Sequence, residues 1–329
     1  MNSSTSIFDS VYEARWRRVL CQYAAWTLGL GLLLAVLAIG LDPYDTGRFA
    51  LFGSHGVPKF GQRMVAASLA RQPHYDMAII GNSAMQLLDP AQFEKYGRKA
   101  VSLAMPGTGP KEQLVVAEWF IKHHPNYAVL VFGIDDRWCE SGHSPRLTHP
   151  FPFWLYGGDT GDYLSHVLEA KNLEAAIRKL KIMSGLDEPL RADGYNDYDT
   201  GKTWDRAGFR ERLNGPNEEG DPQPLTPPPY RFEAAPILQD FLMHLPLGTR
   251  VILIVPPQYR PPLKGDAVLK QNACEATYRD VAAHVMNAQF INFNTQKGLT
   301  YRDVDYWDRL HYRARVAREM EKKIGKILN

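Results

Sequence analysis

Short apolar runs alternate along the chain with longer segments in which apolar residues recur at helical spacing. Several of these runs are rich in β-branched residues and do not alternate with polar ones, as is typical of parallel strands buried on both faces. They predict five strands, at 77–80, 99–104, 127–133, 250–255 and 289–293. Helical spacing predicts helices at 62–71, 111–122, 234–244, 267–287 and 312–328. The alternation indicates right-handed βαβ crossovers, so we expect an α/β fold with a mostly parallel five-stranded sheet.

The alternation stops after the third predicted strand and resumes only near residue 234. Residues 139–230 contain an aromatic cluster at 149–156, a helical pattern at 164–183, a polar stretch at 191–212 and a Pro/Gly-rich stretch at 214–230. A loop of this length without structure is uncommon inside a compact domain. We therefore predict an insertion that folds over the sheet edge as a lid. The alternative is an insertion that serves only packing or partner contacts.

The N-terminal region contains a run without any charged residue, from Val19 to Leu41. A run of this length predicts one transmembrane helix. Arg15, Arg17 and Arg18 precede it and Asp42 follows it, so the positive-inside rule places the N-terminus in the cytoplasm. A cleaved signal peptide is the competing interpretation. The run is long for a signal peptide, and no small-x-small cleavage pattern follows it.

These patterns divide the chain into four parts. Residues 1–18 form a cytoplasmic tail, 19–41 the anchor, 42–61 a linker, and 62–329 an α/β domain on the far side of the membrane. In a bacterial cell this arrangement corresponds to a single-pass inner-membrane protein with a periplasmic domain.

Composition narrows the classes of partner. The chain has 329 residues with 38 basic and 36 acidic side chains, and no basic stripe with interleaved aromatic residues. We therefore expect no nucleic-acid partner. Cys139 and Cys274 both fall on the predicted exported side, where disulfides persist, and either a disulfide or two separate thiols is compatible with the sequence. No Cys/His spacing resembles a zinc site, so we predict neither a metal nor a cofactor.

A first candidate for chemistry follows the strand at 77–80. Gly81-Asn82-Ser83 stands where that strand meets a predicted helical turn at 84–88. This places Ser83 at the carboxyl edge of the sheet, where open α/β sheets bind ligands. Backbone N–H groups at the start of a helix suit an anion or a developing oxyanion. The alternative is that Asn82 or Ser83 only caps the helix.

A second candidate precedes the last predicted helix, where the chain reads Asp308-Arg-Leu-His311. A serine hydroxyl needs a base within hydrogen-bond reach, and that base needs a partner that fixes its tautomer. Asp308 can fold back onto the imidazole of His311. This loop also follows a strand, so His311 and Ser83 can meet at the same sheet edge. A capping role for Asp308 and a surface role for His311 are the alternatives.

Taken together, these motifs resemble those of the SGNH (GDSL-like) hydrolase superfamily. More narrowly, the chain resembles membrane-anchored periplasmic members related to polysaccharide O-acetyltransferases and D-alanyl-transfer proteins. The family's four motifs correspond to 81–83, 102–107, 133–136 and 308–311. The resemblance implies a flavodoxin-like three-layer sandwich with a large insertion after the third strand.

The resemblance also implies roles for individual residues. Ser83 would be the nucleophile, His311 the base and Asp308 its orienting carboxylate. The Ser83 and Gly107 N–H groups would form the oxyanion hole.

Two positions depart from the family pattern. Asn82 replaces the aspartate of the first motif, which is a mild change, and the other departure is Asp135. Asp135 stands where the family has an asparagine that donates to the oxyanion, and an ionised carboxylate cannot donate. We expect Asp135 to point elsewhere, to be protonated, or to leave the oxyanion to the two backbone groups. Arg137 could supply positive charge or pair with Asp135 or Asp136. Asn82, Asp136, Arg137 and Trp138 are the candidate substrate contacts.

The function that these observations predict is acyl transfer through an acyl-serine. The substrate would be an acyl ester or carbohydrate, and the acceptor would be water or a hydroxyl of envelope or exported polysaccharide. A transferase would need a membrane partner that delivers the acyl group. The alternative is a catalytically inactive SGNH-like protein that binds glycan or serves as a scaffold in the cell envelope. A lipid-acting esterase is a third interpretation.

Overall fold

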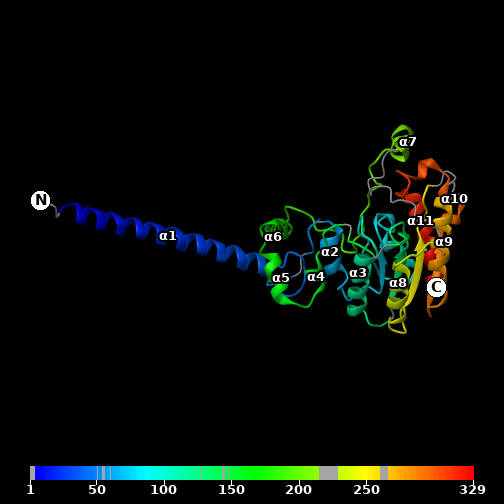
Figure 1. Cartoon of the computed structure of the whole chain (residues 1–329), viewed down its shortest axis with the longest axis horizontal. Helices are drawn as coiled ribbons and strands as arrows, with labels where there is room; N and C mark the ends of the chain where they lie inside the picture. Colours follow the sequence, from blue (N-terminus) through cyan, green and yellow to red (C-terminus); the bar gives the residue numbers. More distant parts are fainter. Residues whose placement is uncertain are drawn as a thin grey trace. The chain divides into compact units, whose positions relative to one another are not determined.

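The computed structural model describes residues 4–49, 51–53, 56–59, 61–126, 128–142, 145–147, 149–214, 229–259 and 266–329. The chain divides into two compact units (Figure 1). One unit comprises Met1–Pro58 and Gly158–Pro189, and the other comprises Lys59–Gly157 and Leu190–Asn329.

The second unit is built on a five-stranded sheet in which every strand pair is parallel, as predicted. The strands lie in the order β2-β1-β3-β4-β5. Their bounds are β1 Met77–Ile80, β2 Ala100–Ser102, β3 Val129–Gly133, β4 Arg250–Val255 and β5 Ala288–Asn292. The central strands β1 and β3 are buried along their whole length, which explains their uninterrupted apolar sequences.

Helices and 3₁₀ turns connect these strands, and five of the α-helices lie close to their predicted positions. The elements of this unit are α2 Gln62–Leu69, η1 Ser83–Met85, η2 Pro90–Tyr96, α3 Pro110–His123, α4 Phe153–Tyr156, α7 Arg206–Asn214, α8 Ala234–Met243, α9 Asp266–Ala283, η3 Phe293–Thr295, α10 Lys297–Thr300, η4 Asp303–Asp305 and α11 Ala314–Leu328.

Each face of the sheet is covered by helices. On one face, Ile79 and Val131 share a buried cluster with Met320 and Ile324 of α11. This apolar stripe of α11 is the one that helical spacing predicted. On the other face, the ring of Phe132 lies 6.2 Å from that of Phe241 in α8. Burial on both sides holds the strands in register, so the loops at their carboxyl ends start from fixed points.

The first unit contains the N-terminal helix α1 (Ser4–Gly40) with α5 (Thr160–Val167) and α6 (Ala170–Met183). The part of α1 from Arg15 to Gly40 is long and apolar enough to cross a membrane, with a mean hydropathy of 1.9. The helix predicted at 164–183 is thus two helices.

The segment after α1, predicted to be a linker, packs against α5 and α6. The Nζ atom of Lys179 is buried and lies 2.9 Å from Asp45 Oδ1 and 2.6 Å from the carbonyl oxygen of Gly56. The hydroxyl of Tyr163 donates to Asp42 Oδ1 over 3.1 Å. These bonds assign 158–189 to the first unit, so the segment predicted as one insertion, 139–230, is divided between the two units. Most of the stretch predicted to be irregular, 214–230, lies outside the described residues.

Candidate active site

Ser83 occupies the turn that follows β1 and is almost buried, with 7% of its surface exposed. The turn is tight because Gly81 and Gly133 leave room for the side chain of Met85, which a Cβ at either glycine would strike. The predicted helical turn at 84–88 is instead the short 3₁₀ helix η1. Asn82 caps it, since its Oδ1 accepts from the backbone N–H of Ala84 over 2.9 Å.

His311 and Asp308 meet Ser83, as their positions at the sheet edge predicted. The Nε2 atom of His311 lies 2.8 Å from Ser83 Oγ. On the other side of the ring, Nδ1 lies 2.6 Å from Asp308 Oδ2. The three side chains therefore form one hydrogen-bonded chain from hydroxyl to imidazole to carboxylate, with nucleophile, base and orienting group in reach of each other.

The electrostatics of Asp308 assign the tautomer of the imidazole. Burial raises the pKa of Asp308, but the hydrogen bond and charge of His311, with the backbone N–H groups of His311 and Leu310, lower it below the ordinary 3.8. Asp308 is therefore ionised at neutral pH and accepts the hydrogen of His311 Nδ1. This leaves Nε2 to accept the hydrogen of the Ser83 hydroxyl.

The loop that carries Asp308 and His311 is closed at its base by an isolated antiparallel bridge between Tyr306 and Tyr312. Within it, the N–H of Trp307 donates to the carbonyl oxygen of His311 over 2.8 Å. The fully buried Tyr312 donates its hydroxyl hydrogen to the carbonyl oxygen of Ala84. This last bond joins the residue after His311 to the residue after Ser83, so it fixes base and nucleophile relative to each other. Sequence reasoning missed it.

The end of the 139–230 segment that belongs to this unit braces the same loop. Asp199 accepts from Trp307 Nε1 over 2.8 Å, Arg313 Nε over 2.9 Å and the Ala314 N–H over 2.9 Å. The ring of Tyr198 stands edge-on to that of His311, with centroids 5.8 Å apart. Burial raises the pKa of Tyr198 well above 10, so this neighbour stays a neutral phenol. This part of the segment therefore positions the base.

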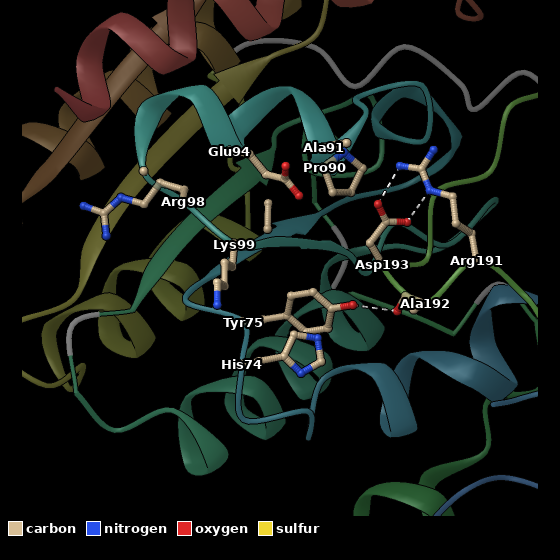
Figure 2. A pocket seen from close by; sticks show the side chains of 12 residues that line it. His74, Tyr75, Pro90, Ala91, Glu94, Arg98, Lys99, Arg191, Ala192 and Asp193 are labelled. Atoms are coloured by element: carbon tan, nitrogen blue, oxygen red, sulfur yellow. Dashed lines mark hydrogen bonds and ion pairs between the residues drawn. The ribbon is translucent and has the colours of Figure 1, made fainter. Parts of the chain in front are cut away.

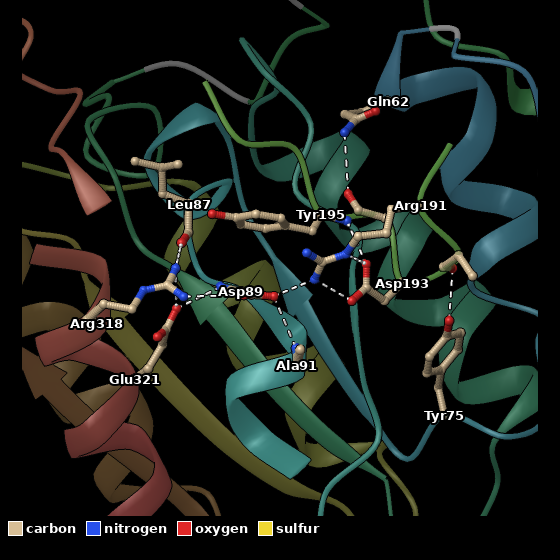
Figure 3. Close-up of polar contacts among 12 residues, drawn as sticks. Gln62, Tyr75, Leu87, Asp89, Ala91, Arg191, Asp193, Tyr195, Arg318 and Glu321 are labelled. Atoms are coloured by element: carbon tan, nitrogen blue, oxygen red, sulfur yellow. Dashed lines mark hydrogen bonds and ion pairs between the residues drawn. The ribbon is translucent and has the colours of Figure 1, made fainter. Parts of the chain in front are cut away.

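A line of charged side chains connects α11 to the chain beyond Ser83 (Figure 3). Arg318 donates through Nη2 to the carbonyl oxygen of Leu87 over 2.8 Å and through Nη1 to Asp89 Oδ2 over 3.3 Å. Glu321 Oε1 accepts the N–H of Asp89 over 2.7 Å, and Arg191 donates to the Asp89 carboxylate. Burial raises the pKa of Glu321 to about 8, against the opposing charge of Arg318. The network therefore ties the segment carrying Ser83 to the helix that follows His311.

The turn after β3 lies beside Ser83. A small cavity of about 20 Å³ is lined by Asn82, Ser83, Ala84, Asp135, Asp136, Arg137, Pro256, Gln258 and Leu310. Asp135 is 7% exposed, and its Oδ1 accepts the backbone N–H of Arg137 over 2.8 Å. The Arg137 guanidinium forms an ion pair with Glu140 at 3.2 Å, where the sequence suggested Asp135 or Asp136 as its partner. Asn82, Asp136 and Arg137 thus line the cavity beside Ser83, and of the three Asn82 is buried.

Gln258 is a residue of this cavity that the sequence did not single out. Its Nε2 donates to Asp136 Oδ1 over 2.9 Å, and its backbone N–H donates to Asn294 Oδ1 over 2.8 Å. The available signal was its position directly after β4 and two prolines, at the same carboxyl edge as Ser83.

Two predicted site residues lie elsewhere. Trp138 is fully buried, and its indole N–H donates to Gln113 Oε1 over 2.8 Å, so a substrate contact would require the core to open. Gly107 lies in the turn after β2 with φ of +64°, a conformation that favours glycine. Neither residue belongs to the described lining of the cavity beside Ser83.

The turn after β3 is held by a disulfide. Cys139 and Cys274 of α9 are bonded, with Cα atoms 5.5 Å apart, so the structure selects one of the two alternatives that the sequence left open. Near it, the hydroxyl of Tyr278 donates to the carbonyl oxygen of Trp138 over 2.8 Å. The candidate substrate contacts on this turn thus start from a covalently anchored backbone.

A much larger cavity, of about 680 Å³, lies beside the amino ends of β1 and β2 (Figure 2). Its wall includes the exposed His74, the buried Tyr75 and the ion pair between Arg191 and Asp193. Tyr75 donates to the carbonyl oxygen of Ala192 over 2.8 Å. This cavity has no nucleophile paired with a base among its lining residues.

No protein-family model matches this chain, and no curated protein is significantly similar to it. Within the described residues, no group of three or more His, Cys, Asp or Glu side chains is arranged to hold a metal ion. The chemical character of the site thus follows from the geometry of Ser83, His311 and Asp308.

Proposed function

We propose that this protein is an acyl-serine enzyme of the SGNH type, an esterase or O-acyl(acetyl)transferase acting on envelope or exported polysaccharide. The observation that carries the proposal is the continuous hydrogen-bonded chain from Ser83 Oγ through His311 to Asp308. Ser83 and His311 are 228 residues apart in sequence but meet in the fold. Acyl transfer through serine requires such a pair of hydroxyl and base, with a carboxylate that orients the base.

In the proposed mechanism, Ser83 Oγ attacks the acyl carbon while His311 Nε2 takes the hydroxyl proton. The tetrahedral intermediate collapses and the leaving alcohol receives the proton from His311. Water or a sugar hydroxyl then gives up its proton to His311 and attacks the acyl-serine, and His311 returns that proton to Ser83 Oγ as the serine–acyl bond breaks. Asp308 stabilises the imidazolium in both steps, and the Ser83 N–H group donates to the oxyanion.

The strand order supports the finer fold assignment. The order 2-1-3-4-5 is that of flavodoxin-like doubly wound sheets, whose ligands bind at the carboxyl edge. Helices on both faces agree with a three-layer sandwich. The segment between β3 and β4 is then an insertion. Its lid function remains part of the proposal, whereas the contacts of Asp199 support a second role in bracing the base.

The proposed location is the periplasmic face of a bacterial inner membrane. In this proposal α1 is the anchor, with Arg15, Arg17 and Arg18 on the cytoplasmic side. The disulfide between Cys139 and Cys274 supports an oxidising compartment for the catalytic unit. As a transferase, the protein would need a membrane partner that brings the acyl group across.

The second candidate function is that of a non-catalytic glycan-binding or scaffold protein of the envelope. It is favoured by one observation, the carboxyl side chain of Asp135 at a position where the oxyanion would need a donor.

Labelling with a serine-reactive fluorophosphonate separates the two functions. The full chain in detergent micelles should acquire one adduct, mapped by mass spectrometry to Ser83. The adduct should be absent from Ser83→Ala and strongly reduced in His311→Ala. If the wild-type protein shows a cooperative thermal transition but no adduct, the acyl-serine function is contradicted and the glycan-binding or scaffold function is favoured.

A further inference from the structure

The proposed acyl-serine function, on which this inference rests, requires hydrogen-bond donors to the oxyanion. The Ser83 backbone N–H can supply one donor, but the side chain at Asp135 brings acceptor oxygens to the turn after β3. One of these oxygens already accepts the Arg137 N–H. A carboxylate next to a developing negative charge would raise the barrier, because it repels that charge. The cavity beside Ser83 therefore needs another donor for efficient catalysis.

Asn82 and Gln258 are the neutral side chains with amide hydrogens among the described residues that line this cavity. Asn82 caps η1 through its Oδ1, whereas Gln258 lies across the cavity on the loop after β4 and is held on two sides. It is 8% exposed, and it lines the same small cavity as Ser83. Asn294 holds its backbone and Asp136 holds one hydrogen of its Nε2. A carboxylate partner fixes which end of the carboxamide is nitrogen, since only the nitrogen can donate to it.

The second hydrogen on Nε2 meets no acceptor among the described residues. Because Gln258 and Ser83 line the same small cavity, this hydrogen is available to the carbonyl oxygen of an acyl group that Ser83 attacks. A donor that is fixed before the substrate arrives costs no reorganisation when charge develops, which is why oxyanion donors are effective.

We infer that Gln258 Nε2–H is an oxyanion-hole donor, taking over the position that Asp135 cannot fill. As the Ser83 Oγ–carbon bond forms, the carbonyl π electrons move to oxygen, and Gln258 donates a hydrogen bond to that oxygen without losing its proton. When the carbonyl re-forms, the leaving alcohol takes its proton from His311. Asp136 is a positioning residue in this assignment, because it acts through Gln258.

The test is steady-state acyl-ester hydrolysis by the full chain in detergent with Gln258→Met, which keeps the length of the side chain but has no N–H. We expect kcat to fall by roughly 10²–10³-fold while KM stays within about 3-fold, the pattern of an interaction made only in the transition state. Fluorophosphonate labelling of Ser83 should slow by a similar factor. The same substitution outside the cavity, Gln92→Met on η2, should leave both rates unchanged.

A second variant controls for the possibility that Gln258→Met loses activity because it does not fold. Gln258→Glu keeps the shape but replaces the amide hydrogens with an acceptor, so it should be at least as slow as Gln258→Met. Turnover within about 3-fold of wild type in either folded variant would contradict the role of Gln258 as an oxyanion donor without contradicting the proposed acyl-serine function. A wild-type chain that neither labels nor hydrolyses would overturn both together.

Discussion

The two edges of the sheet differ in a way that the size of their cavities does not suggest. At the amino edge lies a cavity of about 680 Å³, and at the carboxyl edge lies one of about 20 Å³. The large cavity is lined by charges that pair with nearby carboxylates, such as Arg191 with Asp193 and Arg98 with Asp76. The small one contains a hydroxyl whose hydrogen-bond partner is a base.

The meeting of reactive side chains from several loops is therefore a better indicator of the candidate site than the volume of a cavity. Parallel strands all end at the same edge, so loops from β1, β3, β4 and the segment after β5 bring Ser83, Asp136, Gln258 and His311 together. Guanidinium–carboxylate pairs at the amino edge are already neutralised, so they offer little driving force for proton transfer. Substitutions at the two edges and in the elements that support them should therefore have effects of very different size.

The largest expected effect is at the carboxyl edge. Ser83→Ala should lower acyl-ester turnover by roughly 10⁴-fold or more, because the covalent intermediate can no longer form. Turnover is measured by release of a chromogenic alcohol from the full chain. The thermal transition should not move by more than a few degrees. Full activity in this variant would place the chemistry elsewhere.

Asp308→Asn should have the next largest effect. The amide can donate to Nδ1 and so favour the wrong tautomer, which costs roughly 10²–10⁴-fold in kcat. Because the pKa of Asp308 lies below 3.8, its contribution to stability is present above that pH and is lost as the pH falls through the lowered value. The wild-type protein should therefore lose stability in strong acid more steeply than Asp308→Asn. Equal kcat values would contradict an orienting role.

Removing the disulfide tests the anchoring of the turn after β3. Cys139→Ala with Cys274→Ala should lower the free energy of unfolding by about 2–4 kcal/mol, measured by urea titration of tryptophan fluorescence. Cys21→Ala is the matched control and should have no effect, since Cys21 is an exposed free thiol. Unchanged stability in the double variant would show that packing alone holds the turn.

The network of Figure 3 predicts a pH effect of smaller size. Folding raises the pKa of Glu321 from 4.5 to about 8, so between these values the native state keeps a proton that the unfolded chain has lost. Stability should therefore fall as pH rises through this window, by at most about 1.4 kcal/mol per pH unit. Glu321→Gln should flatten the profile in urea titrations at pH 5 to 8. An equal slope in both proteins would refute the assignment.

The smallest effect is expected at the amino edge. Lys99→Ala and His74→Ala alter exposed side chains of the large cavity, so turnover should stay within about 2-fold and stability within about 0.5 kcal/mol. A loss of 10-fold or more in kcat would show that the two edges are coupled, through Arg191 and Asp89.

Much of the fold could be predicted because its signals are local. Apolar runs located the central strands, and β1 and β4 have the predicted bounds, because a strand buried on both faces is apolar along almost its whole length. The helical turn predicted at 84–88 is shorter in the structure, for a local reason. The Asn82 side chain caps a single 3₁₀ turn there, and the chain reaches Asp89-Pro90 before an α-helix can form.

The parallel sheet, the apolar helix α1 and the grouping of Ser83, Asp308 and His311 at one edge follow from the amino-acid sequence. The bond from Tyr312 to Ala84, the bracing by Asp199, the place of Gln258 and the division of 139–230 between two units became visible in the folded chain. The two sets differ in the range of their contacts. Periodicity and caps act within a few residues, whereas these contacts join positions far apart in sequence, and packing of the sheet and helices sets their geometry.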